Sequence, residues 1–363
     1  MAQQAQYPYN DYYIYVVLHK GEGRRYANLV SIQYGKSVRK TISYAKYGYI
    51  FSIPFVVAFS LFTLYPIIYT IYVAFTDLKG ANPAAVHWIT EVSEDGLFAN
   101  FKDVFKTNMF KVSFGNTCKL WIMNFIPQMG LALLLTAWFT DNRSKIRGQG
   151  FFKVTFYMPN IITAATVAIM FNAFFGYPMG PVNDLLMRFH FTSEPINFVI
   201  KESTAQYIVA FIQFWMWFGY TMITLISGVI GIDPSIFEAA EIDGANRSQT
   251  FFFVTLPCIR QIMLFSLVTS LIGGLNMFDI PYLFQNGGPN NATLTTNVVI
   301  YKWAFTGKYQ YARAGAASLI MFAIIVICSC AVFYIYRDRD AEKAKKARKA
   351  AIREAKLKAK GVA

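Results

Sequence analysis

The sequence predicts an all-α integral membrane protein with six transmembrane helices, and three observations support this prediction. The 363-residue chain is 55% hydrophobic and only 15% charged, which is too apolar for an ordinary soluble domain of this length. A spanning helix needs about 20 mostly apolar residues, and six stretches of the chain meet that requirement. Lys and Arg gather beside alternate loops, which indicates one orientation in the bilayer. The expected spans are roughly 48–75, 112–139, 151–176, 207–230, 261–284 and 311–336.

The orientation follows from where the basic residues lie. An even number of spans leaves both ends of the chain on one side of the membrane. The leading segment, the loop after the second span and the tail are all basic, and short basic segments remain in the cytoplasm during insertion. We therefore expect a multi-pass protein of the cell membrane with both termini in the cytoplasm. The opposite loops, which hold fewer bases and several acids, are 76–111, 177–206 and 285–310.

The same charge pattern divides the chain into three parts. A cytoplasmic N-terminal segment contains a short apolar run near Ile14, too short to span, which we expect to be a small cytoplasmic or interfacial element. The basic tail has helix-forming composition and is expected either to lie solvated near anionic headgroups or to dock onto a partner. The three parts are 1–47, the transmembrane domain 48–336 and the tail 337–363.

Composition also excludes several classes of chemistry. The net charge of the chain is +14, and the basic residues that produce it flank the apolar spans. We therefore expect lipid and no nucleic acid as a partner. The four cysteines lack metal-ligand or disulfide spacing, and the three histidines are scattered singly. The chain has no G-x-x-x-x-G-K-[ST] phosphate loop. We expect no metal, no cofactor and no catalytic residue, and therefore no enzyme activity in this chain.

A segment between the fourth and fifth spans, 232–257, predicts a helix-turn-helix at the membrane surface. Asp233 or Ser235 can cap a first short helix, Gly244 permits a tight reversal, and Asn246 or Ser248 can cap a second helix. Its small residues would let another protein's backbone approach, and the charges around them would fix the register. From the residues alone, a connecting loop that packs under its own bundle explains the segment equally well.

The string EAAEIDGANRSQTFFFVTLP within this segment closely resembles the EAA signature of permease subunits in binding-protein-dependent ABC importers. The resemblance implies the type I ABC importer permease fold, and a loop that sits in a cleft of an ATPase subunit. The implied ATPase-coupling residues are Glu238, Ala239, Ala240, Asp243 and Gly244.

A second string narrows the resemblance to MalF-like sugar permeases. NGGPNNAT, from Asn286 to Thr293, is similar to the G-G-P…A-T region of that group, and shorter matches extend the similarity over about 48–336. The first outer loop is short and lacks the large inserted domain of MalF itself. The resemblance implies transport of a sugar, with an oligosaccharide favoured, through a pathway of which this chain forms half.

Polar and aromatic residues within the spans are candidates for contact with the solute, because polar groups retained in lipid usually face the bundle interior or a watery cavity. The polar candidates are Asn124, Gln128, Asn172, Gln213, Ser270, Asn276 and Asp279, with Lys119 as the one clear cation. Interhelical packing and an aromatic belt explain many of them as well. Alignment to MalF-like permeases implies sugar contacts at or next to eight positions, two of which, Trp217 and Gly274, differ from the maltose permease. The eight are Gln213, Met216, Trp217, Tyr220, Ser270, Gly274, Asn276 and Met277.

The resemblance also implies the partners. They are a second homologous permease subunit, two ABC ATPase subunits that bind ATP and Mg²⁺, and an extracytoplasmic sugar-binding protein. One alternative is an importer for another solute such as glycerol phosphate, which a strongly basic pocket would favour. The other is an ATP-independent channel or carrier, which would favour intramembrane carboxylates or internal repeats and gives no reason for the EAA string.

Overall fold

The computed structural model describes residues 12–17, 31–36, 45–80, 86–141, 146–336 and 347–352. Contacts divide the chain into two compact units, Met1–Pro66 and Ile67–Ala363. In the first unit, β1 (Tyr12–Val17) and β2 (Ser31–Lys36) pair antiparallel, with Tyr12 opposite Lys36. The short apolar run near Ile14 thus forms a strand, which adds a hairpin to a chain expected to be helical throughout.

The first candidate span, Lys46–Ala74, is a continuous helical run with a mean hydropathy of 2.0. It comprises α1 (Ala45–Phe59), a π-helical turn η1 (Ser60–Leu64) and α2 (Tyr65–Ala74). Val73 and Ala74 at the end of this run belong to the second unit and are buried in its core.

Four further helical segments of the described chain are long and apolar enough to cross a bilayer. Each overlaps a predicted span. The first two are α5 (Asn108–Thr140) and α9 (Glu202–Ile230). The others are α13 (Arg260–Leu275) with its short continuation α14 (Asp279–Gln285), and α16 (Tyr311–Ile335).

The third predicted span, 151–176, is not one straight helix. It consists of α6 (Gln149–Ile161) and α7 (Ala164–Phe174), bent by 95° at the break between them. Pro159 near the end of α6 removes a backbone donor, and the Thr163 hydroxyl accepts a hydrogen bond from the Thr166 amide at 3.3 Å to start α7. If this bent pair counts as one span, the described residues contain the six spans that the sequence predicts.

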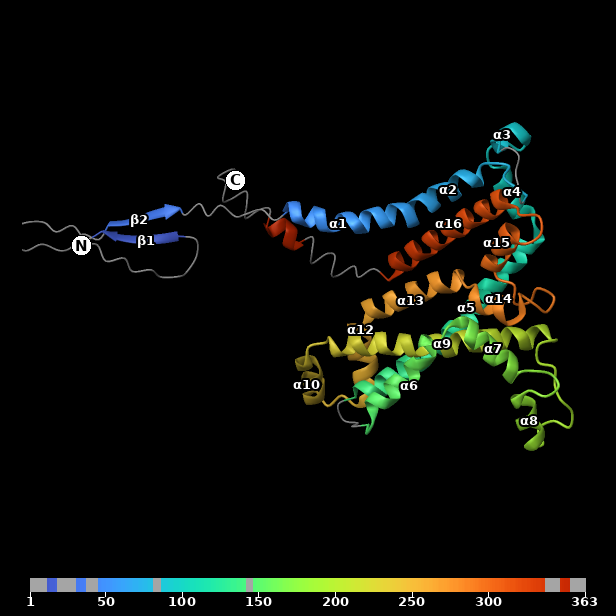
Figure 1. The fold of residues 1–363 in the computed structure, drawn as a ribbon. Coiled ribbons are helices and arrows are strands. Elements are labelled where there is room, and N and C mark those ends of the chain that lie inside the picture. The colour runs from blue at the N-terminus through green and yellow to red at the C-terminus, as the bar shows by residue number, and fades with distance from the viewer. Residues whose placement is uncertain are drawn as a thin grey trace, which may run out of the picture. The chain divides into compact units, whose positions relative to one another are not determined.

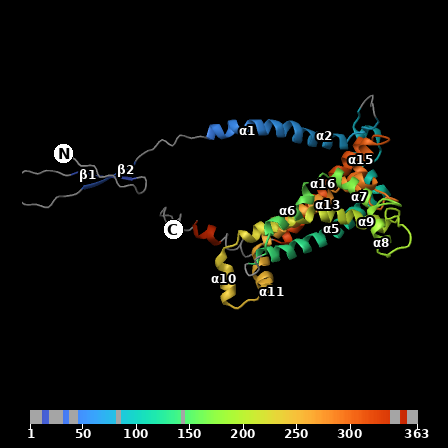
Figure 2. The same cartoon turned by 60° about the horizontal axis from the view of Figure 1, so that its bottom comes forward.

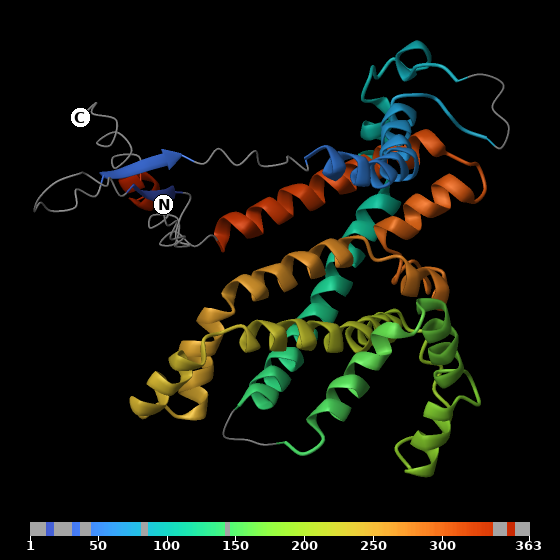
Figure 3. The ribbon, with the colours of Figure 1, turned by 60° about the vertical axis from the view of Figure 1, so that its left-hand side comes forward.

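The core of the second unit is built around α5 and α9, which α6, α7, α13 and α14 flank (Figures 1 and 3). Leu120 and Ile212 are fully buried at the contact between α5 and α9. Gly219 allows α6 to approach closely, because a Cβ there would lie 1.9 Å from the carbonyl oxygen of Phe156. Both small and large residues therefore fix the distances between these helices.

Short elements gather at the two ends of this bundle (Figures 1 and 2). One end, which we call the α10 end, carries α10 (Pro234–Ile242), α11 (Arg247–Gln249), the π-helical turn η2 (Thr250–Thr255) and α12 (Leu256–Cys258). The opposite end, the α15 end, carries α3 (Ile89–Val92), α4 (Ala99–Lys106), α8 (Pro181–Arg188) and α15 (Thr296–Phe305).

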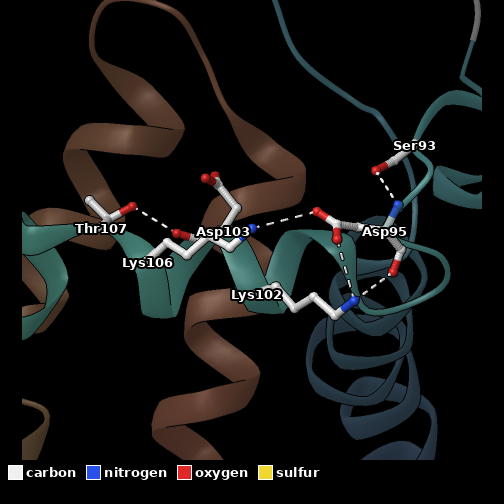
Figure 4. Close-up of polar contacts among 6 residues, drawn as sticks. All are labelled: Ser93, Asp95, Lys102, Asp103, Lys106 and Thr107. Carbon is white, nitrogen blue, oxygen red and sulfur yellow. Dashed lines mark hydrogen bonds and ion pairs between the residues drawn. The ribbon is translucent and has the colours of Figure 1, made fainter.

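Charged residues at the α15 end pair with one another along α4 (Figure 4). The Asp95 carboxylate lies 3.4 Å from the Lys102 amine and 3.7 Å from that of Lys106. All three side chains are at least half exposed, so each pair contributes at most about 1 kcal/mol. Arg313 of α16 joins this region by an ion pair with Asp103 (3.0 Å).

Candidate functional site

A cavity of about 180 Å³ opens between α5, α9 and α13, midway along the bundle. Hydroxyl and amide side chains alternate with aromatic rings on its wall, and the one charged group on the wall is the carboxylate of Asp279. The lining residues are Asn124, Gln128, Gln213, Trp217, Tyr220, Thr221, Ser266, Thr269, Ser270, Gly273, Gly274, Asn276, Met277, Phe278 and Asp279.

Some of the polar groups on the wall are fixed by the protein itself. The buried Gln128 side chain donates to the Thr221 hydroxyl at 2.7 Å, and that hydroxyl donates to the Trp217 carbonyl at 3.2 Å. Trp217 and Tyr220 meet edge to face, with ring centroids 6.0 Å apart. They keep 45% and 37% of their surface exposed, so the cavity presents aromatic faces beside neutral hydrogen-bonding groups.

Seven of the eight predicted contact residues line this cavity: Gln213, Trp217, Tyr220, Ser270, Gly274, Asn276 and Met277. Met216 is the exception, because it is 7% exposed and packs in the core with Leu120 and Ile212. On a helix with about 100° per residue, Met216 lies at the edge of the face that Gln213, Trp217 and Tyr220 share.

At position 274 of the wall, only glycine fits against the neighbouring Trp121 ring. A Cβ at this position would lie 2.0 Å from Cδ1 of Trp121. The indole of Trp121 therefore occupies the space above the glycine, and its Nε1 donates to the Ser270 hydroxyl at 3.4 Å. Gly274 leaves room for the Trp121 indole and offers the cavity no side chain of its own.

Five of the lining residues were not predicted from the sequence: Thr221, Ser266, Thr269, Gly273 and Phe278. The signal for three of them was available, since 266, 269 and 273 share the helical face of Ser270 on α13. Ser266 Oγ is buried without a hydrogen-bond partner among the described residues.

Two of the polar residues that the sequence offers as candidates for solute contact do not line the cavity. The Asn172 amide donates to the Phe284 carbonyl at 2.9 Å and so joins α7 to α14. The Lys119 amine donates to the Gln206 side chain at 2.6 Å. Both residues hold elements together, as expected for polar groups inside a membrane bundle.

The helix-turn-helix predicted in 232–257 is present at the α10 end. The Asp233 carboxylate accepts from the Ser235 amide at 3.0 Å and caps α10, and this hydrogen bond lowers the pKa of Asp233. Gly244, with φ of +75°, supplies the left-handed reversal. Asn246 and Gln249 then form a capping box, with hydrogen bonds of 2.9 and 2.8 Å, that starts α11.

Four of the five predicted coupling residues are exposed on this turn: Glu238, Ala239, Asp243 and Gly244. The exception is Ala240, which is 8% exposed. Its carbonyl accepts from the Ala245 amide at 3.0 Å, so it closes the turn from the inside. Arg247, the first residue of α11, forms an ion pair with Asp141 of its own chain at 3.2 Å.

The second string, NGGPNNAT, forms a loop that joins α14 to α15, in which the three asparagines are exposed and Gly287 is buried. Ala292 is 6% exposed and Thr293 is fully buried. Side chains from other helices bind the loop's carbonyls: the Asn116 amide donates to Asn291 at 2.7 Å and the Gln206 amide donates to Ala292 at 2.7 Å. The buried part of this string therefore acts as internal framework.

The model of the family described as "Binding-protein-dependent transport system inner membrane component" matches residues 120–341, which include the whole cavity wall and the α10 turn. The chain belongs to this family. The membrane fold and the permease resemblance predicted from the sequence are thereby confirmed. The structure adds where the helices break and which residues of the two strings are buried.

Curated relatives agree with this assignment over most of their length. The lactose transport system permease protein LacF of Rhizobium radiobacter is 29% identical over 294 residues, which are 80% of this chain and 94% of LacF. The arabinooligosaccharides transport system permease protein AraP of Bacillus subtilis is 28% identical over 281 residues, 77% of this chain and 84% of AraP.

The fold agrees with a solved structure as well. A chain in the crystal structure of a bacterial alginate ABC transporter, in complex with its alginate pentasaccharide-bound periplasmic protein, superimposes with a TM-score of 0.69 at 22% identity. The match covers 83% of this chain and 97% of that chain.

Proposed function

We propose that this chain is one of the two permease subunits of an ATP-driven ABC importer for a sugar, and that the cavity between α5, α9 and α13 is its half of the translocation pathway. The observation that carries the proposal is the composition of the cavity wall. Neutral hydroxyl and amide groups can exchange hydrogen bonds with sugar hydroxyls, and the exposed rings of Trp217 and Tyr220 can pack against sugar C–H faces.

The wall disfavours the alternative of a phosphorylated solute. No Lys or Arg is among the lining residues, and Asp279 would repel an anion. The names of relatives such as LacF and AraP, which are permeases of lactose and arabinooligosaccharide transport systems, support a neutral sugar of one or more rings.

The partners follow from the α10 turn. We place it in the cytoplasm, where Glu238, Ala239, Asp243 and Gly244 form the surface that docks into an ATPase subunit. Two such ATPases bind ATP and Mg²⁺ and hydrolyse the nucleotide, so this chain needs no cofactor of its own. A second homologous permease completes the pathway, and an extracytoplasmic binding protein delivers the sugar to the α15 end. Both termini lie on the cytoplasmic side.

Closure of the ATPases on ATP would then move the turn and rock the spans, so that the cavity opens to each side in alternation. The mutually packed α5 and α9 are suited to move as a unit, because their contact is close and fully buried at Leu120 and Ile212.

Reconstitution in vesicles tests the proposal. The complete transporter, with the binding protein added outside, should accumulate labelled sugar only when ATP is present on the ATPase side. Glu238→Ala and Gly244→Pro should both lose the copurifying ATPase and with it the uptake. Uptake that persists in these variants, or without any ATPase, would instead support an ATP-independent carrier.

The cavity has its own test. Trp217→Ala and Gln213→Ala should each reduce uptake while ATPase copurification stays intact, because both residues are remote in the fold from the α10 turn. We expect Trp217→Ala to reduce sugar uptake about tenfold, which corresponds to a loss of about 1.4 kcal/mol in the free energy of ring stacking and burial. Unchanged uptake in both variants would remove the cavity from the pathway.

A further inference from the structure

An ion pair links the α10 turn to a helix that is not its neighbour in sequence. Nε of Arg247, the first residue of α11, lies 3.2 Å from Oδ2 of Asp141 at the end of α5. The Asp141 side chain is only 19% exposed and that of Arg247 is 60% exposed. The contact therefore lies at the boundary between the bundle and the turn.

Neither charge is explained by the helix that carries it. Asp141 is the C-cap of α5, where the helix dipole favours a cation. Arg247 is the first residue of α11, where the dipole favours an anion. Each residue is thus unfavourable for its own helix end, and the contact between them offsets that cost. The pair joins two elements and does not serve as a cap for either.

The end of α5 is held from a second side. The Gln149 side chain donates to the Phe139 carbonyl, and the Lys153 amine lies 5.8 Å from the Phe139 ring centroid. Both contacts come from α6. The last turn of α5 therefore has a defined position between α6 and the α10 turn.

From this point α5 leads directly to the cavity. Gln128 and Asn124 line the wall, and at 1.5 Å per residue Gln128 lies about 20 Å along the helix from Asp141. The helices α9 and α13 flank the turn in sequence and receive its motion through the backbone. The cavity's third wall, α5, does not flank it and needs a contact in space.

We propose that Arg247 is a positioning residue that couples the α10 turn to α5 through Asp141, so that motion of the turn shifts the α5 wall of the cavity. This inference rests on the proposed function, since it assumes that an ATPase moves the turn. It assigns to Arg247 a role inside the chain, distinct from the docking surface formed by Glu238 and its exposed neighbours.

The test uses the complete transporter in vesicles and measures sugar uptake and ATP hydrolysis together. Arg247→Gln and Asp141→Asn should each keep the copurifying ATPase and its hydrolysis, while the amount of sugar carried per ATP falls about fivefold, the ratio equivalent to about 1 kcal/mol. Arg260→Gln is the matched control, because it removes an exposed arginine at the start of α13 that forms no ion pair with the described residues, and it should change neither quantity.

A double variant in which the two charges are exchanged distinguishes a loss of coupling from a general loss of structure. Asp141→Arg combined with Arg247→Asp restores the attraction and suits both helix ends better than the natural pair does. It should recover the sugar carried per ATP. Normal coupling in both single variants, or no recovery in the reversed pair, would overturn the inference. If instead the unaltered protein transports sugar without an ATPase, the proposed function itself has failed.

Discussion

Two strings of the sequence carry the family resemblance, and the structure gives them opposite physical roles. The α10 turn is exposed and is stabilised by its own residues, through the Asp233 cap and the Asn246–Gln249 capping box. The Gly-Gly-Pro loop at 286–296 is exposed at its three asparagines but buried at Gly287 and over 292–296. Side chains from α5 and α9, namely Asn116 and Gln206, hold it. A recognisable string can therefore mark either a surface for a partner or a piece of internal framework.

The largest effect should come from adding one methyl group to the buried part of this loop. Gly287 has φ of +84°, and a Cβ there would lie 2.7 Å from Leu294 Cδ1. Gly287→Ala should lower the free energy of unfolding by about 2–4 kcal/mol, because backbone strain adds to overpacking. The measurement is the thermal unfolding midpoint in detergent.

Gly244→Ala is the matched control for this substitution. Its φ of +75° is nearly the same, but a Cβ would meet nothing within 4 Å. We expect Gly244→Ala to lower the free energy of unfolding by about 1 kcal/mol, from backbone strain alone. Equal losses of stability in the two alanine variants would show that the two turns do not differ as we describe.

A smaller effect should follow from removing one amide in each region. Gln206 is 7% exposed and binds both the Ala292 carbonyl and the Lys119 amine. Gln206→Leu leaves both groups without this partner and should cost about 1–3 kcal/mol. Gln249→Leu breaks only the exposed capping box and should cost about 1 kcal/mol or less. Chemical denaturation in mixed micelles measures the free energy of unfolding of both variants. A larger loss of stability for Gln249→Leu than for Gln206→Leu would contradict the view that the Gly-Gly-Pro loop is part of the internal framework.

The smallest effect concerns pH at the α10 turn. The hydrogen bond from Ser235 lowers the pKa of Asp233, so the folded state favours the carboxylate. The contribution of this cap is complete above the pKa of an unfolded aspartate, about 3.9, and is lost as the pH falls through the lower folded value. Hydrogen exchange of the α10 amides, corrected for intrinsic rates, should therefore accelerate below about pH 4. Asp233→Asn, which keeps an acceptor and does not titrate, should show no such change.

The sequence alone was enough to predict the membrane class, the number of spans and the α10 turn. Spans can be predicted from the sequence because a bilayer requires long apolar helices, whatever helices lie beside them. The turn is readable because its caps, Asp233 and Asn246, and its left-handed Gly244 act on residues within three positions. Such signals are local, so they need no knowledge of the fold.

Only the tertiary structure decided which residues are free to meet another molecule. Ala240 and Met216 are among the predicted contact residues but are buried, and the space beside Gly274 is filled by Trp121. The pairing of Arg247 with Asp141 and the burial of part of the Gly-Gly-Pro loop depend on helices distant in sequence. Burial and pairing are properties of the assembled bundle, because they depend on which surfaces packing brings together, and no periodicity along one segment contains that information.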